Sequence, residues 1–522
     1  MTISASTSRP TTYSGHSSTT PPEPSVEIKY KRPDSDAFTA ASRPSPAGRI
    51  GEKNYINNEV LFQDKNVKIS QDFEFAATKK GDVSLISTQI VLETGNRADN
   101  IHITKGTEGK LLVTVNAKAY TLQLHARPDL GQFQPLHIKT HGGNDSVVIA
   151  PDVTTPLIRI DLGAGNDYAH AGGATTQIRG GAGDDYIVMG SGRGAASGED
   201  GNDLLVAGSG STALYGGNGN DRMYAVTPLA KGMVHMDGGN GDDTMVARKR
   251  HAVMHGGGGN NLMVSHDSAV IYTGRGSNRV RSYHDNTTIY AKPSDNVVSS
   301  LNSRRIDVEP SNAGKKAFRV EGSAEFKQNF EDNLELLRMS PTGQGVLQKA
   351  DELAEQNNAP ITLRELSARD DMLYGFNNTS IEQHLEAGGD LDSLTLSQRG
   401  FIVDGQPGAK ADRGTILYNP LSMYNETSSP ITGLAHEMAH AFNGATGTFV
   451  PGNTADSANN NTEEPNLERQ AVGLQTTSAP FDFDGDPNTA PTTTNPPPFT
   501  ENALKREMGL PLRKRVFENP QT

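Results

Sequence analysis

A Gly- and Asp-rich turn recurs between residues 142 and about 280, and it constrains the fold more than any other feature of the chain. Its cores read GGND, GAGND, GAGDD, EDGND, GGNGND, GGNGDD and GGGGNN. The last acidic or amide residue of each core lies 18 residues from the next, with two spacings of 22, and a short apolar run follows most cores. Eighteen residues are two nonapeptides, which form one full coil of a parallel β-roll or β-helix. The sequence therefore predicts an all-β repeat domain over residues 141–285.

These cores resemble the GGxGxDxUx repeats of the RTX, or hemolysin-type, calcium-binding family. In that family, turn carbonyls and the Asp of one coil share a calcium ion with the next coil. The spacing of 18 stacks the Asp-bearing turns along one edge, where the candidate structural calcium ligands are Asp167, Asp185, Asp203, Asp221 and Asp243. The alternative is a metal-free solenoid in which Gly, Asn and Asp only make tight turns. The last core has lost its charge at Asn260 and Asn261 and is expected to be an end cap.

The rest of the chain divides by composition. Residues 1–50 are rich in Ser, Thr and Pro, so we expect a disordered tail, which composition alone does not separate from an uncleaved type III export signal. Residues 51–140 indicate a β-rich lead-in of short strands. Residues 286–315 are polar without a clear period and are expected to form a connector. Residues 316–522 change to α+β patterning and are predicted to form a separate domain.

The chain has no Cys, a formal net charge of −13 and a sequence pI near 5.6. Any metal must therefore be held by His, Asp, Glu or backbone oxygens. The acidic balance argues against nucleic acid or an anionic membrane as the main partner. The N-terminus lacks the apolar core of a cleavable signal peptide, and no run reaches the length of a membrane-spanning helix. We expect a soluble, secreted protein that does not insert into a membrane.

The segment HEMAH predicts a catalytic helix in the C-terminal domain. Ser429-Pro430 is a favoured helix start and Asn443-Gly444 a favoured helix end. His436 and His440 stand at i and i+4, so they share one helix face and can bind one zinc ion. Glu437 is placed to take a proton from the attacking water and pass it to the leaving amine, which makes it the candidate catalytic base.

A tetrahedral zinc site needs a third protein ligand, and no His follows His440 in the sequence. Glu468 is the preferred ligand, because it shares a predicted helix face with Ala471 and Val472. Glu464 is the second candidate, and an exposed acidic helix is the remaining interpretation. Tyr418 and Tyr424 are both candidates for stabilising the oxyanion. The strand signal at 414–418 is a candidate for the edge strand beside the active site.

The segments LAHEMAHAFNG, ERQAVGL and PFTENALKREMGLPLR together resemble the NleD-like zinc metalloproteases, effectors that bacteria inject into host cells. The resemblance covers about residues 325–520. It implies an α+β zincin-like domain with His436, His440 and Glu468 on zinc, Glu437 as the base, and a host protein as substrate. The leading hypothesis is thus a secreted zinc endopeptidase of effector type. The alternative is a calcium-binding secreted or surface interaction protein whose protease-like module is not catalytic.

Overall fold

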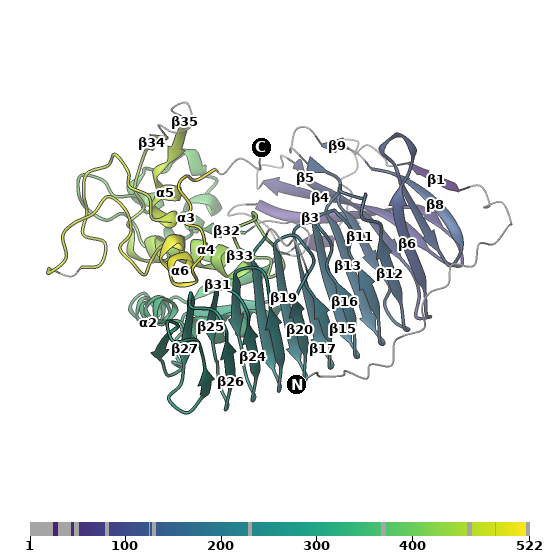
Figure 1. Cartoon of the computed structure of the whole chain (residues 1–522). Helices are drawn as coiled ribbons and strands as arrows, with labels where there is room; N and C mark the ends of the chain where they lie inside the picture. The colour runs from purple at the N-terminus through teal and green to yellow at the C-terminus, as the bar shows by residue number, and fades with distance from the viewer. Residues whose placement is uncertain are drawn as a thin grey trace.

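The structure, a computed structural model, describes residues 25–29, 43–45, 52–78, 83–124, 126–127, 132–227, 232–366, 372–456, 462–485 and 487–517. A parallel β-solenoid of about 9 turns is followed by an α+β region, as the sequence predicts (Figure 1). Within these ranges, none of the helices is both long and apolar enough to span a membrane.

The solenoid has two large sheets that face each other across its core. Sheet A contains, in spatial order, β1 (Val26–Lys29), β8 (Lys118–Gln123), β7 (Leu111–Val115), β6 (Asn100–Lys105), β12 (Ser146–Ile149), β14 (Tyr168–His170), β16 (Tyr186–Val188), β18 (Leu204–Val206), β20 (Arg222–Ala225), β22 (Thr244–Ala247), β24 (Leu262–Ser265), β26 (Arg279–Ser282) and β28 (Asn296–Val298). Sheet B contains β2 (Arg43–Ser45), β3 (Glu52–Gln63), β4 (Lys68–Thr78), β5 (Val83–Glu93), β11 (Leu136–Lys139), β13 (Ile158–Ala164), β15 (Thr176–Ala182), β17 (Gly194–Asp200), β19 (Thr212–Asn218), β21 (Val234–Asn240), β23 (Ala252–His255), β25 (Ala269–Tyr272), β27 (Thr287–Ala291) and β29 (Arg304–Asp307).

The sequence period fixes the register of the coils. In sheet B, Ile160 pairs with Ile178, 18 residues later, and Leu214 pairs with Met236 across one of the four-residue insertions. These side chains point inward, and each is fully buried. A buried side chain of this size contributes roughly 1.5–3 kcal/mol relative to an exposed one. Repeated apolar positions in each coil therefore build one continuous core along the solenoid.

Antiparallel strands close the N-terminal end of the solenoid. Strands β3, β4 and β5 extend sheet B, and β6, β7 and β8 extend sheet A. A further small pair is formed by β9 (Ala126–Arg127) and β10 (Gln132–Phe133). Much of the predicted disordered tail, residues 1–50, lies outside the described residues. Within it, however, β1 pairs with β8 and β2 pairs with β3, so these two segments add strands to the sheets.

The solenoid extends further toward the C-terminus than the repeat motif indicates. Residues 286–315, predicted to be a connector, contain β27, β28 and β29, which pair in parallel with the preceding coils. The prediction was wrong because these coils have lost the Gly-Asp turn but keep inward apolar residues such as Ile289, which pairs with Ile271. Backbone pairing and core packing thus outlast the visible repeat.

The α+β region is built around a four-stranded sheet of order β30-β31-β33-β32. Its strands are β30 (Phe318–Glu321), β31 (Ile361–Glu365), β32 (Leu373–Gly375) and β33 (Thr415–Tyr418), and a separate hairpin joins β34 (Asn453–Asp456) to β35 (Thr462–Pro465). The helices are α1 (Ala324–Met339), α2 (Pro341–Gln356), α3 (Thr379–Glu386), α4 (Pro430–Thr446), α5 (Asn466–Val472) and α6 (Glu501–Glu507). The two edge strands are β30 and the antiparallel β32. Strand β33, the candidate for the edge strand, is not at an edge, because it pairs with β31 on one side and with β32 on the other.

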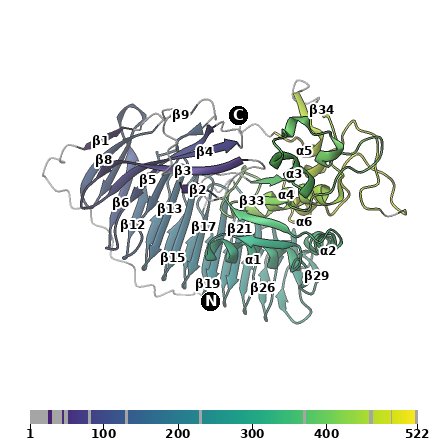
Figure 2. The same ribbon diagram turned by 180° about the vertical axis from the view of Figure 1, so that it is seen from behind.

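The α+β region packs on the outer face of sheet B, as the two opposite views show (Figures 1 and 2). Val270 and Tyr272 of β25 belong to the same buried apolar cluster as Phe326 of α1 and Leu504 of α6. A second cluster joins Ala195, Ala213 and Tyr215 of sheet B to Leu421 and Met423, in the loop before α4. The two parts of the chain therefore share buried surface and are not independent modules.

Candidate metal centre

Helix α4 carries the HEMAH segment. It begins at Pro430 after the predicted N-cap Ser429, although the Ser429 side chain makes no capping hydrogen bond within the described part of the chain. The helix runs past the predicted end at Gly444 to Thr446. Gly447 follows with φ 73°, a left-handed conformation that favours Gly and ends the helix. Most of α4 is buried, so the positions of its functional side chains are set by packing on several sides.

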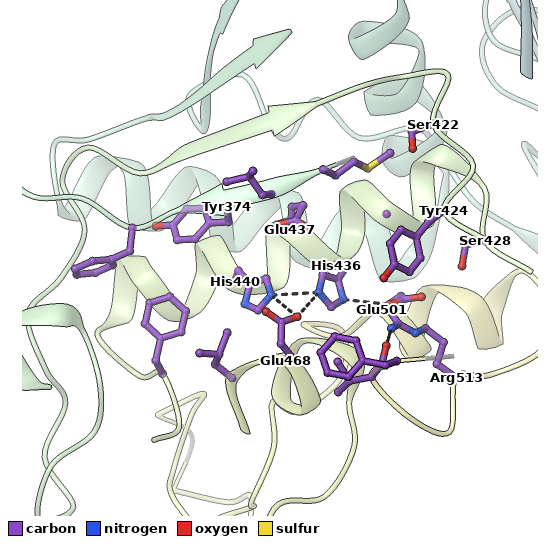
Figure 3. A pocket seen from close by; sticks show the side chains of 18 of the residues that line it. Tyr374, Ser422, Tyr424, Ser428, His436, Glu437, His440, Glu468, Glu501 and Arg513 are labelled. Atoms are coloured by element: carbon purple, nitrogen blue, oxygen red, sulfur yellow. Dashed lines mark hydrogen bonds and ion pairs between the residues drawn. The ribbon is translucent and has the colours of Figure 1, made fainter. Parts of the chain in front are cut away.

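Helix α4 and helix α5 bring three potential ligands together (Figure 3). His436 Nε2 lies 3.1 Å from His440 Nε2 and 3.2 Å from Glu468 Oε2, and the third side of this triangle is 3.4 Å. Ligand atoms about 2.0–2.1 Å from a tetrahedral zinc ion lie roughly 3.3–3.4 Å apart. The three atoms therefore have the mutual spacing that one zinc ion requires.

Glu501 of α6 orients the first histidine. Its Oε2 lies 3.1 Å from His436 Nδ1 and also accepts from Arg513 Nη1 at 2.7 Å, and Lys505 Nζ lies 3.7 Å from Oε1. Because an ionised carboxylate only accepts hydrogen bonds, Nδ1 of His436 carries the proton in the neutral ring. In that tautomer Nε2 of His436 carries a lone pair and points at the Glu468 carboxylate, which also only accepts hydrogen bonds. Neither atom supplies a proton for the contact between them.

The close approach of His436, His440 and Glu468 requires a positive charge between them, either a proton or a metal ion. Burial lowers the pKa of His436, but hydrogen bonds with Glu468 and Glu501 outweigh that effect and raise it to about 10. Burial raises the pKa of Glu468, and its contacts with His436 and His440 hold that pKa well below its usual range. A proton on one atom bridges only two of the three ligands, whereas a metal ion contacts all three. The donor set of two imidazoles and one carboxylate fits zinc.

A cavity of about 440 Å³ opens over these ligands (Figure 3). Glu437, 7% exposed, lines it together with His436, His440 and Glu468. The two tyrosines considered for the oxyanion differ in placement. Tyr424 lines the cavity and is 53% exposed. Tyr418, by contrast, is fully buried in β33 with its hydroxyl bonded to Asn333 Nδ2.

The second candidate ligand, Glu464, lies elsewhere. It belongs to β35 and is 2% exposed. One carboxylate oxygen pairs with Arg469, and the other accepts from the backbone N–H of Val516 at 2.7 Å. Glu464 therefore anchors the C-terminal segment, while the first turn of α5 aims Glu468 at the histidines. Gly473, predicted to end that helix, does so with φ 92°.

Residues 314–515 match the family model Peptidase_M91, described as an effector protein. The match begins just after the last solenoid strand and contains the whole candidate metal centre. No curated protein and no solved structure matches the chain.

Sequence reasoning missed two groups in the peptidase-family region. Glu501 and Arg513 lie 65 and 77 positions after His436 in the chain, in a segment that supplied part of the family resemblance but to which no site residue was assigned. The sequence shows only that Glu501 and Lys505 stand at i and i+4; that they form an ion pair on a helix of which five of seven residues are buried is visible only in the structure. Charged side chains on a buried helix face indicate an internal ion-pair network, not solvent exposure.

The predicted calcium ligands are stacked along one edge of the solenoid, where sheet B turns into sheet A. Each carboxylate uses Oδ1 to accept the backbone N–H of the equivalent Asp one coil earlier, at 2.6–2.8 Å. Each Oδ2 is buried and has no hydrogen-bond partner among the described residues, and Asp145, one coil earlier, shares this arrangement. Burial raises the pKa of Asp203 and Asp243 to about 8.

Proposed function

We propose that the peptidase-family region is a zinc-dependent endopeptidase. The observation that carries the proposal is the triangle of His436, His440 and Glu468, which opens on a cavity that Glu437 also lines. The match to a peptidase family supports the same reaction class. In this proposal the two histidines and Glu468 hold the ion, while Glu501 keeps His436 in the tautomer whose Nε2 faces it.

A zinc ion bound here would supply Lewis-acid polarisation of the scissile carbonyl and of the attacking water. Glu437 takes one proton from that water as its oxygen bonds to the carbonyl carbon. It then delivers the proton to the amide nitrogen as the C–N bond breaks. Of the two candidate tyrosines, Tyr418 and Tyr424, only Tyr424 lines the cavity, and it donates to the oxygen on which negative charge develops. Arg513, whose guanidinium carbon lies 5.8 Å from the Tyr424 ring centroid, packs beside it.

The cavity favours an apolar substrate residue. Its wall away from the ligands is largely aromatic and aliphatic, formed by Met372, Phe376, Ile381, Phe401, Phe449, Val516 and Phe517. An apolar pocket discriminates by size, because each methylene buried contributes about 1 kcal/mol or somewhat more to transition-state binding. We infer that a large apolar side chain of the substrate occupies this wall during cleavage.

The effector description supports a protein substrate in a host cell, and the NleD-like character of the C-terminal segments agrees with it. The experiment that tests this function compares new N-termini in a host-cell lysate treated with wild-type protein or with Glu437→Gln. The wild type should generate a small set of new N-termini with a recurrent apolar residue near the cleaved bond, and the variant should generate none of them. Identical N-terminal profiles from the two proteins contradict the proposal.

A further inference from the structure

The loop between β33 and α4, residues 419–428, forms one side of the cavity over the candidate metal centre. Ser422, Tyr424 and Ser428 line the cavity and lie along this side of it (Figure 3). Of these three side chains Tyr424 alone is exposed, whereas residues 419–423 are buried throughout. A buried loop keeps one shape only if neighbouring elements cover its apolar side chains and bond its backbone. The source of that support therefore decides where Tyr424 lies.

The apolar side chains of loop 419–428 are covered by the solenoid. Leu421 and Met423 form a buried cluster with Ala195 of β17 and with Ala213 and Tyr215 of β19. Among the described residues, this cluster has no other member. The two alanines are small enough to let the loop lie against sheet B, and the tyrosine supplies a large apolar surface beside them. The apolar support of the loop within this cluster thus comes entirely from the solenoid.

A hydrogen bond from the solenoid fixes the loop on the other side of Tyr424. Ser211, which directly precedes β19, is fully buried, and its hydroxyl donates to the carbonyl oxygen of Glu426 at 2.7 Å. The turn that leads to Ser211 is itself held by Arg250, whose guanidinium donates to two carbonyl oxygens of that turn at 3.0 and 3.1 Å. Tyr424 therefore lies between Met423 and Glu426, which both contact the solenoid.

The solenoid also anchors the helix that holds the end of the loop. Lys505 of α6 is fully buried, and its Nζ donates to the hydroxyl oxygen of Ser428 at 3.2 Å. Tyr272 of β25 donates from its hydroxyl to Glu507 of the same helix at 2.8 Å. His251 Nε2 lies 2.8 Å from the carbonyl oxygen of the residue that caps the C-terminus of α6. The second half of the loop thus rests on a helix that is bonded to the solenoid.

We propose that the solenoid is a positioning scaffold for the reaction, in which Ser211 and Tyr215 hold loop 419–428, and through it Tyr424, in the geometry that hydrolysis requires. This inference rests on the proposed peptidase function, in which Tyr424 donates to the oxygen that gains negative charge. A donor stabilises that charge only when it is held at hydrogen-bond distance from it, and a loop that moves loses this placement. The solenoid supplies the order before the substrate binds.

The scaffold acts on the loop and not on the ligand triangle. His436, His440 and Glu468 are placed by α4 and α5, whereas Ser211 bonds the backbone of the loop. Loosening the loop through Ser211 should therefore slow hydrolysis and leave the zinc content unchanged. This pattern separates a positioning residue from a residue that only stabilises the fold.

The first test is a double-mutant cycle on the full-length, zinc-loaded protein with a peptide that the wild type cleaves. Ser211→Ala removes one buried hydrogen bond and should lower kcat about 3- to 10-fold, with KM and zinc content nearly unchanged. In the Tyr424→Phe background the same change should cost no further activity, because the hydroxyl that it positions is gone. An unchanged kcat in Ser211→Ala, or losses that multiply in the double variant, overturns the positioning role.

The matched control is Thr212→Val. Thr212 is as deeply buried as Ser211, but its hydroxyl donates within the solenoid, to the carbonyl oxygen of Gly210 at 3.0 Å. Its kcat should equal that of the wild type. An equal loss of kcat in Thr212→Val and Ser211→Ala would show a general effect of solenoid stability and overturn the role of the bond to Glu426.

The second test needs no substrate, so it separates the anchoring of the loop from the proposed reaction. Hydrogen exchange of full-length Ser211→Ala should become faster over residues 419–428 and keep the wild-type rate over α4, whereas Thr212→Val should match the wild type in both segments. Unaltered exchange of the loop in Ser211→Ala overturns the proposal even if the peptidase is active. A wild type that cleaves no peptide contradicts the proposed function, and the positioning role in catalysis falls with it.

Discussion

Replacing Glu501 by Gln removes a single negative charge from the buried network behind the candidate metal centre. Glu501 is 2% exposed, and its carboxylate contacts His436, Arg513 and Lys505. Two cations with side chains 7% and 0% exposed are then left without their buried partner. Removing one partner of a buried ion pair costs about 3–5 kcal/mol of stability. Loss of the carboxylate that orients a metal-binding His lowers metal affinity about 10- to 100-fold, or roughly 1.4–2.8 kcal/mol.

The two effects are measured separately. Denaturant unfolding of the zinc-free protein reports the stability change, and competition with a chromophoric chelator reports zinc affinity. Glu464→Gln is the matched control, because Glu464 is also 2% exposed and ion-paired but does not contact the histidines. We expect both variants to lose stability and only Glu501→Gln to lose zinc affinity. Unchanged zinc affinity in Glu501→Gln, or an equal loss in Glu464→Gln, refutes the positioning role.

Three further predictions concern Glu199 and Tyr215 of the solenoid and Tyr424 of the cavity. Burial, partly opposed by Arg179, raises the pKa of Glu199 from 4.5 to about 7, so the folded state holds a proton that the unfolded state releases between these pH values. Wild-type unfolding free energy should therefore fall by roughly 1–3 kcal/mol relative to Glu199→Gln between pH 4.5 and 7, and parallel pH profiles from denaturant titrations would exclude this. Tyr424→Phe should lower kcat about 100-fold on a peptide substrate with zinc content and KM nearly unchanged; an unaltered kcat removes Tyr424 from the mechanism. Tyr215→Ala should cost about 3–5 kcal/mol of stability and raise KM, because Leu421, the chain neighbour of the cavity-lining Ser422, loses its support; destabilisation with normal kinetics would show that the contact is only structural.

The sequence predicts those parts of the fold that depend on local geometry. A turn that recurs every 18 residues determines the coil, the two-sheet core and the line of stacked aspartates, because each coil repeats the same backbone path. Two histidines at i and i+4 lie on one helix face in any helical context. Glu468 could be found for the same reason, since its position relative to Ala471 and Val472 is set within one helix.

The features that were missed depend on contacts between distant segments. Glu501 reaches His436 only through the packing of α6 against α4, and a short charged helix does not reveal its neighbour. The docking of the peptidase-family region on sheet B was also not predicted. A signal for it exists in β17 and β19, where Ala195 and Tyr215 make the outward positions apolar as well as the inward ones. A strand that is apolar on both faces indicates that both faces are covered.

Zinc content per chain is a direct measure of whether His436, His440 and Glu468 form a metal centre. Purified protein, reloaded with zinc after chelation and then desalted, is measured by elemental analysis together with the variants His436→Ala, Glu468→Gln and Glu464→Gln. We predict one zinc ion per chain in the wild type and in Glu464→Gln, and far less than one in His436→Ala and Glu468→Gln. A wild type without zinc, or full zinc content in His436→Ala, would show that these side chains do not form a zinc site.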